Sequence, residues 1–228
     1  MRTCASKLPG VHTDLMETGR SSVPATRAAR KAASRARILA AARDLFEDRD
    51  FDAVTVGEIA DRAGVAHGSV FHHFESKKGV YRAVLDAVVD EMDAAFDGSA
   101  DTTDLDAVRR GLRAHLTYAA QHRGLTTRLV LGRRSPDPDV RAASERGRER
   151  VLTAIALALE VDPTREANIF VGRVMATAFD EATVLWLESD GTLLAHAVVD
   201  WMIEMMEAAI DAVPALEGRA GRRNLPSL

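Results

Sequence analysis

The chain has 228 residues, of which 46% are hydrophobic, 5% aromatic and 28% charged, a balance typical of a soluble globular protein rich in helices. Its single cysteine, Cys4, excludes a disulfide framework within the chain. The chain has no apolar run of about eighteen residues and no apolar signal core, so we expect a cytoplasmic protein with no membrane partner.

Charge is distributed unevenly along the chain. The net charge is −4, yet residues 1–43 carry nine Lys or Arg against only Asp14 and Glu17, and the remaining residues carry 21 bases against 32 acids. A basic end of this kind is typical of a protein that contacts nucleic-acid phosphates at one pole. A solvated basic segment that touches nothing is the alternative. Within it, residues 1–26 show no apolar period and are predicted to be a disordered arm, whose contact with DNA stays open.

Residues 27–76 are predicted to form a small three-helix domain. A helix is expected from Arg27 to Glu47, with an apolar stripe made by Ile38, Leu39, Ala42, Leu45 and Phe46. Two shorter helices are expected over 56–62 and 67–73. Thr55 and Glu58 have the spacing of a capping box at the start of the first short helix.

The two short helices have the layout of a helix-turn-helix. Ala60 is small enough for the helices to approach each other, and Gly64 supplies the turn because glycine reaches positive φ without strain. Three apolar side chains close the small core between them: Ile59, Val65 and Val70. This pattern favours a DNA-binding motif over an ordinary helical hairpin.

Residues 35–80 resemble the N-terminal DNA-binding domain of TetR-family transcriptional regulators. The resemblance rests on the apolar stripe and on Phe51, Thr55, Ile59-Ala60, Ala63-Gly64-Val65, Phe74 and Lys77. It implies a DNA-binding head, a helical ligand-binding and dimerising body, regulation by a small molecule, and the following DNA-binding residues: Thr55, Ala66, His67, Gly68, Ser69, Phe71, His72, His73 and Lys77. Among these, His67 can donate to a guanine and Phe71 can contact a thymine methyl.

Two positions depart from the family pattern. Phe71 stands where the family usually has tyrosine, so a hydroxyl that could bind a phosphate is missing. Ala66 stands where a small polar residue usually caps the recognition helix, which weakens that cap by about 1 kcal/mol.

Residues 77–213 are predicted to form the helical body, followed by a flexible tail over 214–228. Ser76 caps the first body helix, which is expected to end at Asp97-Gly98-Ser99, and Gly124 is expected to break the second. The expected helices cover residues 77–96, 105–122, 126–132 and 139–160, then run from the cap Asp162 to Glu188 and from the cap Thr192 to Val213.

The last two long helices are apolar around more than one face. A helix at a protein surface needs only one apolar stripe, so the surplus predicts a four-helix bundle between two subunits. The interface residues we expect are Trp201, Met202, Met205 and Ile210. Burial of both faces within one subunit is the alternative.

A mostly apolar effector pocket is expected in the body. Its candidate lining residues are Met92, Phe96, Tyr118, His122, Met175 and Phe179, each of which could equally be plain core. His115 and His122 lie two turns apart with Tyr118 between them, and they could line the pocket or be ordinary helix positions. The spacing of the histidines fits neither a metal site nor a catalytic constellation, so we expect no metal, no cofactor and no enzymatic activity.

Together these observations predict an all-α, homodimeric, ligand-responsive regulator that binds a partly palindromic double-stranded DNA operator. Repression, relieved by a small and mostly apolar effector, is what the family resemblance implies. A helical small-molecule enzyme or carrier with an incidental N-terminal hairpin is the alternative, and a nonspecific DNA-coating protein is a third interpretation.

Overall fold

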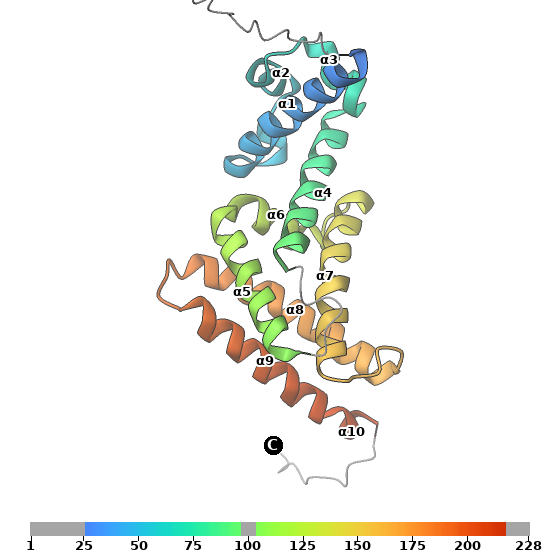
Figure 1. Cartoon of the computed structure of the whole chain (residues 1–228), viewed down its shortest axis with the longest axis vertical. Coiled ribbons are helices and arrows are strands. Elements are labelled where there is room, and N and C mark those ends of the chain that lie inside the picture. The colour runs from blue at the N-terminus through green and yellow to red at the C-terminus, as the bar shows by residue number, and fades with distance from the viewer. Residues whose placement is uncertain (1–25, 97–103, 218–228) are drawn as a thin grey trace, which may run out of the picture.

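The computed structural model describes residues 26–96 and 104–217, and these residues form helices without any β-strand. The expected fold class is confirmed: a three-helix head stands on a larger helical body (Figure 1). The head contains α1 (Arg27–Asp48), the short 3-10 helix η1 (Phe51–Ala53), α2 (Val56–Ala63) and α3 (His67–Phe74). Residues 1–25 of the predicted arm over 1–26, and the predicted turn at 97–99, lie outside the described residues, whereas Thr26 caps α1.

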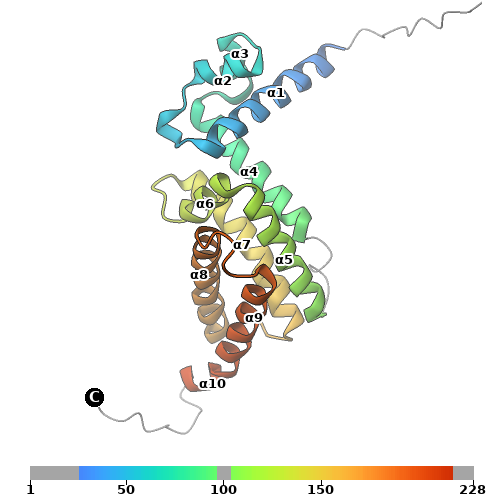
Figure 2. The same ribbon diagram turned by 90° about the vertical axis from the view of Figure 1, so that its left-hand side faces the viewer.

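The body consists of seven helices within the described part of the chain. They are α4 (Lys77–Phe96), α5 (Leu105–Gln121), α6 (Arg123–Gly132), α7 (Pro138–Ala158), α8 (Glu166–Glu188), α9 (Ala195–Asp211) and α10 (Val213–Leu216). Helix α4 leaves the head and descends into the body, where it packs against α5 and α7 (Figures 1 and 2). Helices α8 and α9 pack on each other, and α8 runs along the body up to α6, which in turn contacts α1 of the head (Figure 2).

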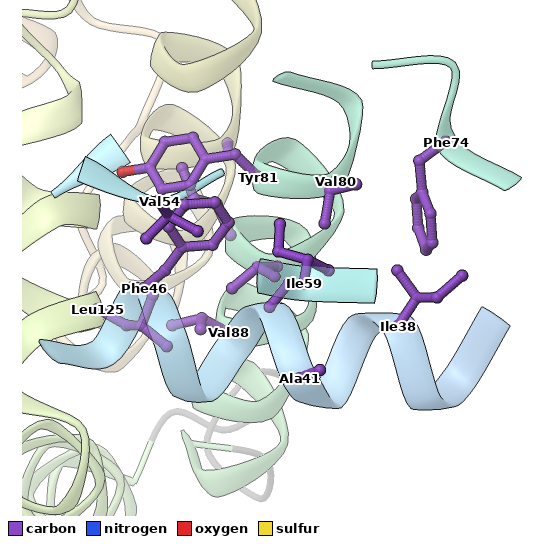
Figure 3. Close-up of a cluster of buried hydrophobic side chains, with 14 of the residues drawn as sticks. Ile38, Ala41, Phe46, Val54, Ile59, Phe74, Val80, Tyr81, Val88 and Leu125 are labelled. Carbon is purple, nitrogen blue, oxygen red and sulfur yellow. The ribbon is translucent and has the colours of Figure 1, made fainter. Parts of the chain in front are cut away.

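The apolar core of the head continues into the upper body. Phe46 of α1, Ile59 of α2 and Val80 of α4 are fully buried together, and Tyr81 packs its ring edge against Phe46 at 4.9 Å (Figure 3). The same cluster includes Leu125 of α6, which is also fully buried. Head and body are therefore joined by close packing rather than by a linker alone.

A second apolar cluster fills the lower body. It gathers side chains from α4, α5, α7, α8 and α9, among them Phe96, Leu116, Ile155, Phe179 and Ile203. All five are buried, so both long C-terminal helices contribute one face to the interior of a single subunit.

Three predicted helix starts are wrong. Helix α6 begins at Arg123 rather than at 126, and Gly124 is part of that helix instead of a breaker. Asp162 closes a turn by accepting hydrogen bonds from the backbone and hydroxyl of Thr164, at 2.8 and 2.7 Å, so α8 begins only at Glu166. Thr192 donates its hydroxyl to the Ser189 carbonyl, and α9 begins at Ala195 without a side-chain cap.

The boundary after the last long helix also differs from the prediction. The tail was expected from residue 214 onward, yet Val213 is buried and begins the single turn α10. Proline is tolerated at the first turn of a helix because its missing N–H is not needed there, so Pro214 is compatible with this turn. Residues 218–228 lie outside the described part of the chain.

Candidate DNA-binding site and effector cavity

The first helix of the motif begins with the expected capping box. The Thr55 hydroxyl oxygen accepts from the Glu58 backbone N–H at 3.2 Å, and Glu58 accepts from the Thr55 backbone N–H at 2.8 Å. Arg49 also donates to Glu58 at 2.7 Å. The Arg49 guanidinium and the Thr55 donors hold the pKa of the Glu58 carboxyl at about 2.

The turn between the helices is also as expected. Gly64 has φ of +63° and ψ of +43°, the left-handed region that favours glycine. Its backbone N–H and that of Val65 both bond to the carbonyl of Ala60, which closes the end of α2. Ala66, at the start of α3, makes no side-chain cap, in agreement with the prediction from its type.

Most of the predicted base-reading residues share the exposed side of α3. Ala66, His67, Gly68 and His72 are exposed, and Phe71 keeps 44% of its surface accessible. The imidazole of His67 lies 5.3 Å from the Phe71 ring, centre to centre, so a polar donor and an apolar edge sit side by side. An arrangement of this kind can read a base pair in the major groove.

His73 is less available than its neighbour. It is partly buried, and its pKa is lowered by that burial and by the nearby charges of His72, Lys31 and Arg35. It packs against Phe74, whose ring also lies under the Arg35 guanidinium at 4.8 Å. Ser69 is also partly exposed and can donate its hydroxyl to a phosphate.

Lys77, predicted to contact DNA, has hydrogen-bond partners inside the head. Its ammonium donates to the carbonyls of Phe51 and Val54 at 2.9 and 3.0 Å and lies 4.2 Å from the centre of the Phe51 ring. An ammonium with two of its three protons used inside the head is a structural clamp between η1 and α4. The available positive charge lies instead on α1, where Arg27, Arg30, Lys31, Arg35 and Arg37 are exposed.

A cavity of about 90 Å³ lies inside the body. Of the predicted pocket residues, Met92, Phe96 and Phe179 line it. Met175 is buried in the same core without lining the cavity. His115 also lines it, and burial lowers the pKa of that imidazole to about 4, so it is neutral at physiological pH.

Tyr118 and His122 were predicted to line the pocket, and the structure places them elsewhere. The Tyr118 hydroxyl donates to Glu91 of α4 at 2.8 Å and accepts from Arg43 of α1 at 2.8 Å. Arg43 pairs with Glu91 at 2.5 Å and lies 3.4 Å from His122 Nε2. Hydrogen bonding from Arg43 lowers the pKa of the Glu91 carboxyl. This polar cluster joins the head to α4 and α5.

A second contact joins the head to α6. Glu47, near the end of α1, accepts from the backbone N–H groups of Gly124 and Leu125 at 2.7 and 3.4 Å. Arg128 of α6 donates in return to the Glu47 carbonyl at 3.1 Å and to Asp50 at 3.2 Å. The negative Glu47 carboxylate thus lies at the N-terminus of α6, and the positive Arg128 guanidinium lies at the C-terminus of α1. These are the charges that the helix dipoles favour. Sequence reasoning missed this contact because its partners lie far apart along the chain.

Helices α8 and α9 leave large apolar side chains exposed. Trp201 of α9 is 52% accessible, and on α8 the exposed apolar residues are Ile169, Phe170, Val174 and Leu185. Met205 and Ile210 are partly buried. Met202, predicted at the interface, is only 3% accessible and lines the cavity, so it belongs to the interior.

A family model described as "Bacterial regulatory proteins, tetR family" matches residues 38–84, which span the motif and its flanking helices. Over these residues the chain is similar to the TetR family. The relatives and solved structures that the chain resembles are transcriptional regulators of this family and not enzymes.

The relatives include both a transcriptional activator and a transcriptional repressor. The TetR-like chain is 29% identical to the transcriptional activator FasR of Mycolicibacterium smegmatis over 187 residues, which are 79% of this chain and 84% of FasR. It is 38% identical to the transcriptional repressor KstR2 of Rhodococcus jostii over 69 residues, 30% of this chain and 34% of KstR2. This second match therefore spans about a third of KstR2.

Solved TetR-family structures share the fold along most of the chain. A regulator from Streptomyces coelicolor superposes with a TM-score of 0.70 at 21% identity, covering 81% of this chain and 83% of that one. FadR from Bacillus subtilis, in complex with stearoyl-CoA, gives 0.61 at 15% identity, covering 76% and 98%. No helix in the described ranges has both the length and the apolar character needed to span a bilayer.

Proposed function

We propose that this chain is a homodimeric TetR-family repressor in the cytoplasm that releases a partly palindromic operator when an effector occupies its body. The observation that carries the proposal is the exposed side of α3, which presents His67 and Phe71 behind a well-formed turn at Gly64. Two such heads would enter successive major grooves about 34–36 Å apart.

The DNA contacts follow from the exposed residues of the head, which covers residues 27–76. His67, Gly68 and Phe71 are proposed to face bases, and Thr55, Ser69 and the basic residues of α1 are proposed to face phosphates. The relatives include an activator and a repressor, so they do not decide between the two roles. Repression is proposed because a protein bound to the operator would block transcription until the effector releases it.

Assembly is proposed to occur through α8 and α9. The exposed apolar side chains Phe170, Val174, Leu185 and Trp201 would be covered by the same face of a second copy. Large exposed patches of this kind are uncommon on proteins that stay monomeric.

The effector is proposed to be mostly apolar, because the cavity walls contain Met92, Phe96, Leu116 and Phe179. Solved FadR structures from Bacillus subtilis and Thermus thermophilus contain stearoyl-CoA and lauroyl-CoA respectively, which supports an effector with a long apolar chain. The alternative of an enzyme or carrier is not retained, since the relatives are regulators.

A competition gel shift with the promoter region of its own gene tests the proposal. A complex that resists nonspecific competitor DNA is expected, and His67→Ala should weaken it by about 1–3 kcal/mol while relaxing the preference at one base pair. His196→Ala, a change at an exposed position of α9, is the matched control and should leave binding unchanged. Equal affinity for all sequences would instead indicate a nonspecific DNA-coating protein.

A further inference from the structure

Two hollows adjoin in the body. The inner cavity, of about 90 Å³, is walled by apolar side chains of α4, α5 and α8. An open groove of about 730 Å³ lies between α7 and α8 and is lined by Ile155, Val161, Ile169 and Gly172, among others. Arg148 and Leu152 of α7 line both, so these two residues form part of the wall between them.

The wall between the hollows is built around ions. Arg148 of α7 pairs with Asp180 of α8, and Arg133, directly after α6, lies 4.0 Å from the same carboxylate. Arg133 also donates to the hydroxyl of Thr177, which lines the groove, at 2.5 Å. The Arg133 Nε–H is buried and has no hydrogen-bond acceptor among the described residues.

The inner cavity and the groove differ in the size of ligand that each can hold. Pockets that bind small molecules usually enclose about 300–1,000 Å³, so the inner cavity alone is too small for such a ligand and the groove alone is large enough. The inner walls contain Met92 and Met202, whose flexible side chains can repack around an inserted chain. A ligand that uses the apolar cavity must therefore extend past Arg148 into the groove.

Charge indicates what the wall can accept. Arg133 and Arg148 share one partly buried carboxylate, Asp180, whereas the other acid lining the cavity, Asp93, is matched by Arg150 at 2.8 Å. Glu145 lies 3.8 Å from Arg148, but its side chain is exposed and solvent screens it. Burial raises the pKa of the Asp180 carboxyl, and the nearby charges of Arg148 and Arg133 oppose that rise. One further anion beside the two guanidinium groups would satisfy the unused Arg133 donor.

We propose that the effector is an amphiphile with an anionic head, whose apolar chain enters the inner cavity past Arg148. The anionic group lies beside Arg133 and Arg148, and the rest of the head occupies the groove between α7 and α8. This rests on the proposed function, in that the body is the effector site. A free carboxylate and an acyl thioester that carries phosphates share this chemistry.

Titration calorimetry with the full chain and no DNA tests the charge. Octanoate is expected to bind at least about tenfold more tightly than octanol or octyltrimethylammonium, because only the carboxylate accepts a charge-assisted hydrogen bond from a guanidinium group. Arg133→Gln should remove most of that difference while keeping a neutral donor. Octanoyl-CoA is titrated in parallel to distinguish a free carboxylate from an acyl thioester that carries phosphates. If octanoyl-CoA binds more tightly than octanoate, the groove holds the larger head group. Equal binding of the three octyl probes would overturn the anionic head.

A space-filling variant tests the groove. A Cβ at Gly172 would meet no atom within 4 Å, so Gly172→Phe places a ring in the groove without a backbone clash. It should lower the affinity for the tighter of octanoate and octanoyl-CoA at least about tenfold, whereas Gly172→Ala should leave it unchanged. If Gly172→Phe binds that probe normally, the groove is not part of the site. A changed sedimentation coefficient with normal binding would assign the groove to the subunit interface and overturn the proposal in the same way.

The anionic site and the proposed regulation of DNA binding can fail independently. If the anionic probes bind as described and operator affinity in the gel shift does not change, the site stands and the coupling to DNA fails. If octanol alone releases the operator, the regulator stands and the anionic site fails.

Discussion

Gly124 offers a direct test of how the head is held on the body. It lies in α6 beside the end of α1, and a Cβ built on it would lie 1.8 Å from the carbonyl oxygen of Glu47. Real Cβ atoms do not approach other atoms closer than 3.0 Å, so Gly124→Ala forces the two helices apart by about 1 Å. The Arg128 guanidinium, which would lie 2.7 Å from that Cβ, can move aside, but the Glu47 backbone cannot.

The cost can be estimated from what that displacement breaks. Glu47 accepts from Gly124 at 2.7 Å, and Arg128 donates to the Glu47 carbonyl at 3.1 Å. Overpacking costs about 1–3 kcal/mol, and lost hydrogen bonds to charged groups cost about 1.5–3 kcal/mol each. Alanine returns up to about 1 kcal/mol through helix propensity. If both bonds are lost, a net loss of about 3–8 kcal/mol follows, which corresponds to a fall in Tm of roughly 6–32 °C for a chain of this size.

Calorimetric melting with Gly172→Ala as the matched control tests the estimate. Gly172 is also in a helix, and its added Cβ would meet only open space, so that variant should be neutral or stabilised by about 0.5–1 kcal/mol. Gly124→Ala should also weaken operator binding, because the heads lose their fixed position. Equal melting temperatures for the two variants would show that α1 and α6 are not packed as described.

Three further results are expected. Lys77→Met should destabilise the head by about 1–3 kcal/mol in urea unfolding, because two carbonyls lose their donor, while Lys78→Met, which removes only an exposed pair with Asp137, should cost less than about 1 kcal/mol. Native His115 resists protonation down to a pKa of about 4 while the unfolded chain takes up that proton near 6.5, so stability falls as pH drops from 6.5 to 4. His115→Gln should lose this part of the pH dependence in urea unfolding and His67→Gln should keep it. Trp201→Glu should give monomers or aggregates in sedimentation experiments where the wild type is a dimer, and an unchanged dimer would contradict the proposed interface.

The head could be predicted closely because its signals are local. The capping box at Thr55 and Glu58 and the left-handed turn at Gly64 each depend on residues within a few positions. The same holds for the missing cap at Ala66. Helix starts that rest on a single polar residue were less secure. Asp162 and Thr192 both form local turns with neighbouring groups, which is the usual competition between such side chains and a helix start.

Contacts between distant segments could not be predicted from periodicity. The pattern of α5 marks which residues are buried but not what they are buried against, so Tyr118 was assigned to an apolar pocket although its hydroxyl serves Glu91 and Arg43. The internal contacts of Lys77 were missed for the same reason, since its acceptors precede it by 23 and 26 positions. A buried hydroxyl or ammonium requires a partner, and only the fold reveals which one it finds.

Helix α6 connects the DNA-binding head to the effector cavity. Its first turn receives the Glu47 carboxylate of the head, and its last turns supply Leu129 and Val130 to the cavity, with Arg133 following directly. A ten-residue helix spans about 15 Å, so the head contact and the cavity wall are separated by one rigid element. A ligand that repositions Arg133 therefore acts on the same element that holds α1, through backbone hydrogen bonds and without an intervening loop. This short path is why Gly124 and Arg133 are more informative to vary than any single apolar residue of the cavity.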